Sequence, residues 1–494
     1  MTLAVVEERP VAATPKEYLL FIDGQWTPGS DGSFDDDINP ATGEVFARVA
    51  RATRDDAVRA VDAAHRARLS WGQMILSERS AILLRAADIL EARAAEFRDL
   101  IIVESGSAIA KATFEIHYCV NLLRSASADA HYLFGETLPK TMPGQLGMTV
   151  RQPLGVIGGI APFNAPFLLA MKKVCLALAA GNTFVLKPSE ETPITGIKIA
   201  ELFEAAGLPA GVFNVVPGNP AEIGEVLIDD PRVRMITFTG STRVGKMLAV
   251  EAAKRLKRFA LEMGGKNPLI ILRDADIDYA ARAAGFGIFF HQGQVCMANS
   301  RIIVERPVFD AFCARFAEQT KKYKVGDPRD PDTVVGPLIR QSQCGFIDGQ
   351  IQDALGKGAR LLLGGTHDGA FFQPTILADV RPDMRIFHEE SFGPITSIIP
   401  VDSAEEALAI ANDTSYGLSA GVITNDLQKA MTLALELESG MVHINDTTVH
   451  DEPHVPFGGV KDSGFGREGG RYSMEEMTEL KWITIQLGQR DFPF

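Results

Sequence analysis

Cysteine is scarce in this 494-residue chain. Its five cysteines stand far apart, with no C-x-x-C pair and no histidine at ligand spacing: Cys119, Cys175, Cys296, Cys313 and Cys344. An odd, sparse set of this kind argues against a disulfide framework and a structural zinc site, so no metal is expected. It favours a reducing compartment. We therefore expect free thiols and a cytoplasmic protein.

Long apolar runs and basic blocks are also missing. The best apolar stretch, residues 167–180, is interrupted by Lys172 and Lys173 and is too short to cross a bilayer. The first ten residues carry neither a basic segment nor a long apolar one, so no secretory signal is expected. Asp and Glu (63) outnumber Lys and Arg (49), which gives a formal net charge of −14. Neither a nucleic acid nor a membrane is expected as a partner.

What is present is the composition of a globular protein with two or three domains. Residues 1–16 show no apolar period and are predicted to form a flexible tail. Residues 18–22, followed by Asp23-Gly24, predict a strand and a hairpin turn. Apolar positions at three- and four-residue spacing then predict helices at 57–69, 78–100 and 112–133.

Short apolar strands alternate with helices beyond residue 150. Predicted strands at 155–160, 183–186, 212–216 and 235–238 are each followed by a helix. This alternation is typical of a parallel sheet with right-handed crossovers, so we expect a Rossmann-like α/β domain. A second α/β set begins near residue 264. The apolar stretch 481–487 predicts a terminal strand that must pair with something, such as a second subunit.

Two residues near the change from the first α/β set to the second are candidates for covalent chemistry. Cys296 ends Gly293-Gln294-Val295-Cys296, and Glu262 ends a predicted strand just before Gly264-Gly265. A thiolate can attack a carbon centre, and a carboxylate can accept a proton or activate water. The structural alternatives are a buried, inert thiol, a solvated or helix-capping Glu262, and a simple turn at the glycine pair.

Segments at predicted strand ends are candidates for nucleotide binding. Lys187-Pro188-Ser189-Glu190 offers a cation and a carboxylate to a ribose, and a carboxylate there disfavours a 2′-phosphate; the alternative is a surface turn. In the segment 239–245, Gly240 can make a tight turn, Ser241 can cap the next helix, and Gly245 can let a phosphate or another backbone approach. This segment is not G-x-G-x-x-G, so an ordinary capped helix explains it equally well.

Two further segments can also be interpreted either as parts of a functional site or as ordinary structural elements. Asn164 stands between Pro162 and Pro166, and its amide can donate to a developing oxyanion or cap a helix. Glu390 and Phe392, in Glu389-Glu390-Ser391-Phe392-Gly393-Pro394, can hold a nicotinamide ribose or form a charged loop.

Taken in order, these segments resemble the aldehyde dehydrogenase superfamily over about residues 18–490. With the strand and helix pattern, the resemblance predicts an NAD-binding domain at 17–130 and 151–262 and a second α/β catalytic domain at 263–440, extending to about 475. It also predicts a small β arm for oligomerisation at 131–150 and 476–494, in a homodimer or homotetramer.

The resemblance further implies a role for each candidate residue. Cys296 is similar to the nucleophile that forms a thiohemiacetal and then, after hydride loss, a thioester; Asn164 is similar to the oxyanion donor, and Glu262 to the base that activates water for hydrolysis. Members that pass the acyl group to coenzyme A typically lack this Glu, so a free acid is the expected product. The implied NAD contacts are Ile160, Ala161, Pro162, Phe163, Lys187, Ser189, Glu190, Gly218, Thr239, Gly240, Ser241, Gly245, Glu390 and Phe392.

Substrate choice is the least constrained of these inferences. The segments 289–300 and 443–453 look most like bacterial benzaldehyde, vanillin and salicylaldehyde dehydrogenases, so an aromatic aldehyde is expected. Aliphatic aldehydes, semialdehydes and a non-catalytic protein of the same fold are the alternatives. Arg243, where many members have an acidic or small residue, leaves NADP as an alternative to NAD. The candidate tunnel residues are Phe163, Phe167, Leu169, Phe290, Val295, Met297 and Phe457.

Overall fold

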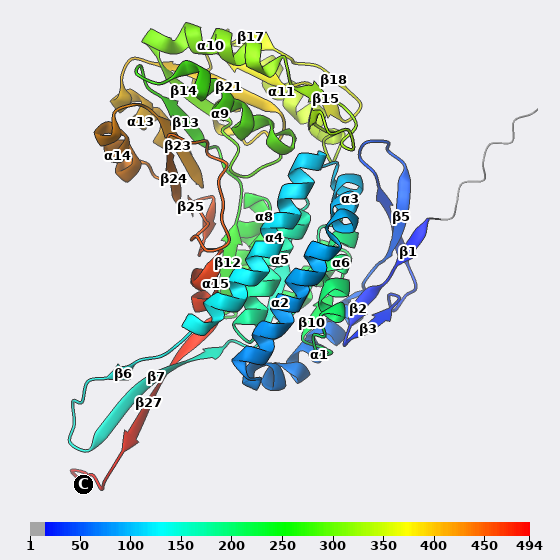
Figure 1. Cartoon of the computed structure of the whole chain (residues 1–494), viewed down its shortest axis with the longest axis vertical. Helices are drawn as coiled ribbons and strands as arrows, with labels where there is room; N and C mark the ends of the chain where they lie inside the picture. Colours follow the sequence, from blue (N-terminus) through cyan, green and yellow to red (C-terminus); the bar gives the residue numbers. More distant parts are fainter. Residues whose placement is uncertain (1–14) are drawn as a thin grey trace, which may run out of the picture.

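The computed structural model describes residues 15–494, so the flexible tail predicted for residues 1–16 lies almost entirely outside the described residues. Figure 1 shows three parts: one built mainly from the first half of the chain, a second above it, and a narrow β arm that projects away from both. Helices and mostly parallel sheets make up the first two parts, which confirms the predicted α/β class.

The chain begins with five short strands. They are β1 (Lys16–Tyr18), β2 (Leu20–Ile22), β3 (Gln25–Thr27), β4 (Phe34–Ile38) and β5 (Val45–Ala50). Strands β2 and β3 pair antiparallel around Asp23 and Gly24, whose φ angles of 54° and 72° lie in the left-handed region that a two-residue hairpin turn requires. The predicted hairpin is confirmed.

Four helices follow the opening strands. They are α1 (Arg54–Gln73), α2 (Leu76–Ala92), α3 (Ala94–Ser105) and α4 (Ile109–Asp129). Thr53 and Asp56 cap α1 reciprocally, each side chain bonding the other's backbone N–H. The single helix predicted for 78–100 is wrong, because Arg93 (φ −105°, ψ 17°) leaves the helical conformation and divides this stretch into α2 and α3.

The first large sheet has eight strands in the order β26-β12-β11-β8-β9-β10-β2-β3. Five of them run parallel: β8 (Val156–Ile160), β9 (Thr183–Lys187), β10 (Phe213–Val215), β11 (Val233–Thr239) and β12 (Arg258–Glu262). The helices between them are α5 (Pro166–Ala179), α6 (Pro193–Ala205), α7 (Pro220–Asp229) and α8 (Thr242–Lys254). The strand order changes direction between β8 and β11, and sheets of this kind bind ligands outside the carboxyl ends of such strands.

The second large sheet has seven strands in the order β17-β20-β21-β14-β13-β23-β24, all parallel except the edge strand β17. The strands are β13 (Pro268–Ile271), β14 (Arg301–Glu305), β17 (Arg360–Leu363), β20 (Thr375–Ala378), β21 (Ile395–Val401), β23 (Ser419–Ile423) and β24 (Met441–Ile444). The helices are α9 (Ile277–Phe289), α10 (Arg306–Thr320), α11 (Ser342–Gly356), α12 (Arg385–His388), α13 (Ala404–Asn412) and α14 (Leu427–Glu436).

Short elements complete the connections. They are β15 (Lys324–Val325), β16 (Thr333–Val335), β18 (His367–Asp368), β19 (Phe371–Phe372), β22 (Tyr416–Gly417), β25 (Val460–Lys461), β26 (Gly464–Phe465) and α15 (Gly470–Glu476). Strand β26 pairs antiparallel with β12, so the last part of the chain returns to the first sheet beside Glu262.

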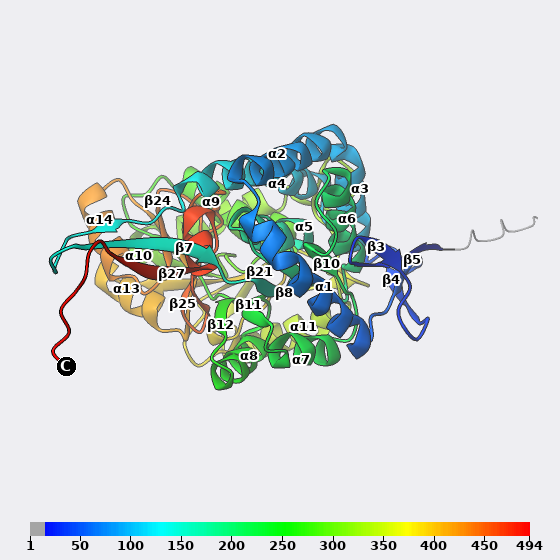
Figure 2. The ribbon, with the colours of Figure 1, turned by 90° about the horizontal axis from the view of Figure 1, so that it is seen from below.

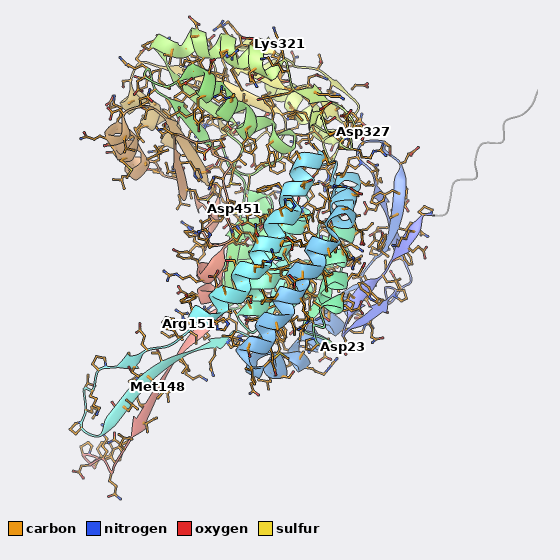
Figure 3. The ribbon with its side chains drawn as sticks, viewed as in Figure 1. Asp23, Met148, Arg151, Lys321, Asp327 and Asp451 are labelled. Atoms are coloured by element: carbon orange, nitrogen blue, oxygen red, sulfur yellow. The ribbon has the colours of Figure 1, made fainter. Side chains whose placement is uncertain are left out.

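The arm consists of β6 (Thr137–Leu138), β7 (Gln145–Pro153) and β27 (Thr478–Gln486). The predicted terminal strand is β27, and its partner is β7 of the same chain, from Thr478↔Pro153 to Gln486↔Gln145. Its other edge pairs with no strand in residues 15–494, and Trp482 on it is 67% exposed. Figure 2 shows how far this ribbon extends, and Figure 3 labels Met148 and Arg151 along β7.

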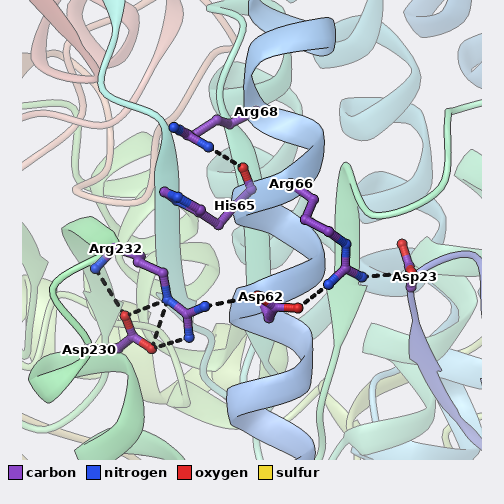
Figure 4. A network of polar contacts seen from close by, with 7 residues as sticks. All are labelled: Asp23, Asp62, His65, Arg66, Arg68, Asp230 and Arg232. Atoms are coloured by element: carbon purple, nitrogen blue, oxygen red, sulfur yellow. Dashed lines mark hydrogen bonds and ion pairs between the residues drawn. The ribbon is translucent and has the colours of Figure 1, made fainter.

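Charged side chains join α1 to the loops around it (Figure 4). Asp62 accepts from Arg66 and from Arg232 (3.0 Å), while Arg66 also contacts Asp23 (2.9 Å) and Arg232 contacts Asp230 (2.7 Å). The side chains of Arg232 and Asp230 are partly buried, whereas those of Arg66, Asp23 and Asp62 are exposed. Exposed pairs contribute only about 0.2–1 kcal/mol each, so buried apolar packing accounts for most of the stability. Helix α5 illustrates that packing, because all of its residues are buried.

In the described part of the chain no helix is long and apolar enough to cross a membrane.

Candidate active site

Cys296 lies on the loop between α9 and β14, against the segment that joins the two large sheets. The side-chain amide of Asn267 in that segment donates to the carbonyl oxygens of Cys296 (2.8 Å) and Ala298 (3.0 Å). Just before the cysteine, His291 and Gln292 have φ angles of 50° and 56°, so the chain turns sharply there. Cys296 is partly exposed, whereas the other four cysteines are buried. It is therefore the least enclosed of the five cysteines.

The glycine pair Gly264-Gly265 makes room for two neighbours. A Cβ atom on Gly264 would lie 2.3 Å from a carboxylate oxygen of Glu390, and one on Gly265 would lie 2.3 Å from the carbonyl oxygen of Cys296. The Gly265 N–H also donates to Glu390 (2.9 Å). The pair is therefore more than a turn, because it lets the cysteine loop and Glu390 pack against the joining segment.

Glu262 is the last residue of β12 and is only 3% exposed. Neither of its carboxylate oxygens has a hydrogen-bond partner among residues 15–494. A Cβ on Gly458 would lie 2.8 Å from one of these oxygens, so glycine is needed there as well. Burial raises the pKa of Glu262 well above its usual value, and the negative charge of Glu468 raises it further, while Lys173 and Lys172 lower it.

The pKa of the Cys296 thiol is raised, first by burial and then by Glu262 and Glu390, while Lys172 lowers it. A thiol in this state is mainly protonated near neutral pH and needs a base before it can attack. Glu262 lies near Cys296, because its carboxylate is next to Gly458 and the neighbouring Phe457 belongs to the apolar cluster against which Cys296 packs. Glu262, with its unpartnered oxygens, is the candidate base.

Asn164 lies on the loop between β8 and α5 and is buried. Its side-chain NH2 donates to the carbonyl oxygen of Gln294 (3.0 Å), two residues before Cys296. The alternative role as a helix cap is wrong, because α5 begins with Pro166 after an Ala165 N-cap. The first free N–H groups of α5, on Phe167 and Leu168, donate instead to Glu115 (2.8 and 2.9 Å). The amide of Asn164 is thus directed to the cysteine loop.

Most of the cofactor candidates share one edge of the eight-stranded sheet. Ile160 at the end of β8 pairs with Lys187 in β9 and with Phe238 in β11, so the segments that follow these strands emerge side by side. They contain Ile160, Ala161, Pro162, Phe163, Lys187, Ser189, Glu190, Thr239, Gly240 and Ser241. The hydroxyl of Thr239 is buried and has no partner in the described residues.

Two of these residues already contact each other. The Lys187 ammonium donates to the Glu190 carboxylate at 2.6 Å. Burial lowers the pKa of Lys187, and Glu190 raises it. A ribose at this position would find a donor and an acceptor next to each other.

The predictions for the 239–245 turn and for Gly218 are modified by the packing. Gly240 makes the turn and donates its N–H to the carbonyl of Glu262 (3.0 Å). Ser241 occupies the N-cap position of α8, but its hydroxyl makes no capping bond, so the predicted capping is wrong. The space beside Gly245 is filled by Met263, whose sulfur would lie 2.2 Å from an added Cβ, rather than by a phosphate or another backbone. Gly218 pairs with Ala52 in an isolated bridge.

Glu390 and Phe392 connect this edge to the cysteine. Burial raises the pKa of Glu390 to about 7. The ring of Phe392 packs edge-to-face on Phe163, with centroids 5.8 Å apart. Both Glu390 and Phe392 line a recess that is also bordered by Gly265 and Val295. The predicted nicotinamide-side residues are thus next to the loop of Cys296.

Three of the substrate candidates surround the thiol. Met297 and Phe457 form a small apolar cluster with Leu418, and Val295 and Cys296 pack against it. Phe290 is stacked on Phe286 (5.0 Å) and meets Phe114 edge-to-face (6.1 Å). Phe114 and Phe286 are 46% and 49% exposed, so this aromatic group extends to the surface.

Phe167 was expected in the same tunnel, and that expectation is wrong; Leu169, also expected there, is 6% exposed and stays a prediction. Phe167 is 1% exposed and packs on Phe97 at 5.3 Å, and Leu169 belongs to the same large core. Both lie on α5, which is buried on every side and therefore offers no apolar periodicity from which a tunnel face can be chosen.

Sequence reasoning missed two buried polar groups beside the site. Lys172 binds Asp451, which also accepts from the Tyr118 hydroxyl (3.0 Å). Lys173 binds Glu468, which accepts from the Thr237 hydroxyl (3.0 Å). The residues of each group come from segments far apart in the chain, so only the apolar setting of Lys172 and Lys173 in 167–180 could have drawn attention to them.

A partly exposed thiol with a buried carboxylate in reach, next to the carboxyl edge of a Rossmann-like sheet, is the arrangement of a nucleotide-dependent dehydrogenase that works through a cysteine. In residues 15–494 no group of three or more His, Cys, Asp or Glu side chains could hold a metal ion.

The comparisons with known proteins agree. Residues 26–483 match the model of the aldehyde dehydrogenase family, and this chain belongs to that family. It is 44% identical to vanillin dehydrogenase from Pseudomonas fluorescens over 96% of this chain and 99% of the relative. It is also 44% identical to a benzaldehyde dehydrogenase from Bacillus subtilis, over 96% and 98%. The structure of salicylaldehyde dehydrogenase from Pseudomonas putida G7 complexed with salicylaldehyde superposes with a TM-score of 0.95, at 42% identity over 97% of this chain and all of that one. The chain is therefore an enzyme that oxidises aldehydes, and its family uses NAD or NADP.

Proposed function

We propose that the chain oxidises an aromatic aldehyde of the benzaldehyde type to its carboxylic acid, with NAD as the electron acceptor. The observation that carries this proposal is the convergence on Cys296 of Glu262, Asn164 and an apolar wall made by Val295, Met297 and Phe457.

In the first half-reaction, Cys296 attacks the aldehyde carbon and forms a thiohemiacetal. Glu262 accepts the thiol proton: Glu390 and Asp451 also raise the pKa of Cys296, but they accept from Gly265 and Lys172, whereas neither oxygen of Glu262 has a partner in residues 15–494. The amide of Asn164 uses one N–H on Gln294, and its second N–H, with the backbone N–H of Cys296, stabilises the oxyanion. A donor of this kind contributes about 3 kcal/mol to the transition state.

NAD(P), when bound, supplies the hydride acceptor. The residues that would hold it are Lys187, Ser189 and Glu190 at the adenosine ribose, the 239–241 turn, and Glu390 with Phe392 at the nicotinamide ribose. The residues present fit such a group, because the buried hydroxyl of Thr239 has no partner in residues 15–494 and Glu390 keeps a buried carboxylate next to the cysteine loop. Glu190 favours NAD because a 2′-phosphate beside a carboxylate is repelled.

In the second half-reaction, a thioester on Cys296 is hydrolysed. Once Glu262 has released the thiol's proton to solvent, it takes a proton from water and directs the resulting hydroxide at the acyl carbon. It then returns that proton to the leaving thiolate, which releases the acid and restores the thiol. A carboxylate with no hydrogen-bond partner in the described part of the chain is suited to this task, since both of its oxygens can accept from water.

The domain roles follow from this assignment. We assign NAD binding to residues 17–130 and 151–262, catalysis to 263–440 with an extension to about 475, and oligomerisation to 131–150 and 476–494. The unpaired edge of β27 and its exposed Trp482 support assembly into a homodimer or homotetramer. The five free cysteines favour the cytoplasm.

A kinetic panel tests the proposal. We expect benzaldehydes to exceed medium-chain aliphatic aldehydes and semialdehydes in kcat/KM by at least about tenfold, which is about 1.4 kcal/mol, and NAD to exceed NADP. Preference for an aliphatic aldehyde or semialdehyde would refute the aromatic assignment, and preference for NADP would refute the cofactor assignment.

A further inference from the structure

A buried polar group stands beside the proposed substrate wall and has no part in the reaction described above. It consists of Tyr118 on α4, Lys172 on α5 and Asp451 on the loop after β24, and Figure 3 labels Asp451 where the two large parts of the molecule meet. The Lys172 ammonium binds both carboxylate oxygens of Asp451 (2.8 and 3.0 Å), and the Tyr118 hydroxyl donates to one of them (3.0 Å). We call these three residues the polar triad.

The polar triad is adjacent to the residues that surround the thiol. The Lys172 ammonium lies 4.4 Å from the ring centroid of Phe457, which belongs to the cluster against which Cys296 packs. Tyr118 packs on Phe114 (5.9 Å), and Phe114 contacts Phe290. The charges of Asp451 and Lys172 both act on the pKa of Cys296, in opposite directions. An aldehyde held at Cys296 therefore has the polar triad within its surroundings.

The charges of the polar triad cancel, and this restricts what it can recognise. An ammonium and a carboxylate in direct contact have no net charge to attract an anionic substituent, which argues against a semialdehyde that carries a carboxylate. A wall for a purely apolar substrate would contain no such group, because burying charged side chains costs free energy even when they are paired. A neutral substituent that both donates and accepts hydrogen bonds is the complementary partner.

The polar triad has bonding capacity left for such a substituent. Among residues 15–494 the Lys172 ammonium, which has three N–H bonds, hydrogen-bonds only to Asp451. One oxygen of Asp451 does not contact Tyr118, and within residues 15–494 it accepts a hydrogen bond only from Lys172. Burial and then Asp451 raise the pKa of Tyr118, so its hydroxyl stays a donor and holds the carboxylate in place.

We propose that the polar triad recognises a hydroxyl group on the ring of the aromatic aldehyde: Lys172 donates a hydrogen bond to the phenol oxygen, Asp451 accepts one from the phenol O–H, and Tyr118 positions Asp451. This inference rests on the proposed function, because it names the substituent that the proposed aromatic substrate carries. It assigns substrate selection to a group distant from Cys296 in sequence and not involved in bond making.

The test compares substrates within each variant. The kcat/KM for ortho-, meta- and para-hydroxybenzaldehyde is divided by that for benzaldehyde, with NAD, in the wild-type enzyme, in Tyr118→Phe and in the double variant Lys172→Met/Asp451→Asn. The double variant removes both charges together and so leaves no buried unpaired charge. We expect the ratio for at least one hydroxy isomer to fall about tenfold in the double variant, since bonds to charged groups are being lost, and by a smaller factor in Tyr118→Phe.

Phe114→Leu is the matched control. Phe114 packs on Tyr118 without a polar atom, so its replacement should change kcat/KM for all benzaldehydes by a similar factor and leave the ratio unchanged. The inference is overturned if no ratio changes by more than about twofold in the folded variants, as monitored by NAD binding and thermal unfolding. If the wild-type enzyme instead prefers aliphatic aldehydes, the proposed function itself fails. This failure can be told apart from a failure of the polar-triad inference, because it is seen in the wild-type enzyme and requires no variant.

Discussion

Replacing Gly265 with alanine tests how closely the cysteine loop is packed. An added Cβ would lie 2.3 Å from the Cys296 carbonyl oxygen and 2.7 Å from the side-chain amide of Asn267, whereas ordinary contact begins at 3.4 Å. The obstacle is backbone, so it cannot rotate away as a side chain can. The loop must therefore move by about 1 Å, the difference between 3.4 and 2.3 Å.

A shift of about 1 Å in a reacting group costs about a hundredfold in rate. We expect Gly265→Ala to lower kcat for benzaldehyde by about that factor and to destabilise the fold by about 1–3 kcal/mol through overpacking. Steady-state NADH formation gives the first quantity, and urea unfolding gives the second.

Gly345→Ala is the matched control for this experiment. Gly345 is an exposed residue of α11, and a Cβ there would meet no atom within 4 Å. Alanine should leave kcat unchanged and stabilise the protein by about 0.5–1 kcal/mol. If Gly265→Ala keeps more than a third of the wild-type kcat, the loop does not depend on this contact and the reasoning is refuted.

Three further predictions concern the cofactor, the base and the arm. The Cβ atom added by Gly264→Ala would lie 2.3 Å from the Glu390 carboxylate and would displace it. Because Glu390 is proposed to hold the nicotinamide ribose, this variant should raise KM for NAD more than it lowers kcat. An unchanged KM would show that Glu390 does not bind the cofactor. Glu468→Gln removes a negative charge that raises the pKa of Glu262, so the rising limb of the kcat–pH profile should move to lower pH. Lys173→Met removes a positive charge that lowers this pKa, so the same limb should move to higher pH. Shifts of the two variants in the same direction would contradict Glu262 as the base. Trp482→Asp on the open edge of β27 should reduce the molar mass measured by light scattering, and an unchanged mass would exclude this edge from the interface.

Much of the fold could be predicted because local patterns determine it. The alternation of strands and helices from β8 to α8 follows from short apolar runs separated by amphipathic stretches. The break at Arg93 was missed because no proline or glycine marks it and the apolar period continues through it. Strand β27 was predicted, but its partner β7 lies more than three hundred residues earlier in the chain, and no local pattern specifies that pairing.

The site was predictable where chemistry is concentrated in one segment. Cys296, Glu262 and Asn164 each stand in a short distinctive motif. In the structure Asn164 donates to the loop that carries Cys296, and the charge of Glu262 raises the pKa of Cys296. Tyr118 and Asp451 carry no such signal, because they matter only through a contact between segments 333 positions apart. Phe167 was misplaced for the opposite reason, since a helix buried all round does not reveal which side faces a substrate.

We propose that Cys296 carries the acyl group between oxidation and hydrolysis. The most direct measurement uses Glu262→Gln, which keeps the shape of the side chain but cannot accept a proton from water. The variant is mixed with benzaldehyde and NAD, quenched in acid, and digested for mass spectrometry. We expect NADH formation that is slow, because the thiol has lost its base, and that stops at one NADH per active site, with a benzoyl group on the peptide that contains Cys296. A benzoyl group on another cysteine, or a burst of NADH with no acylated peptide, would contradict it.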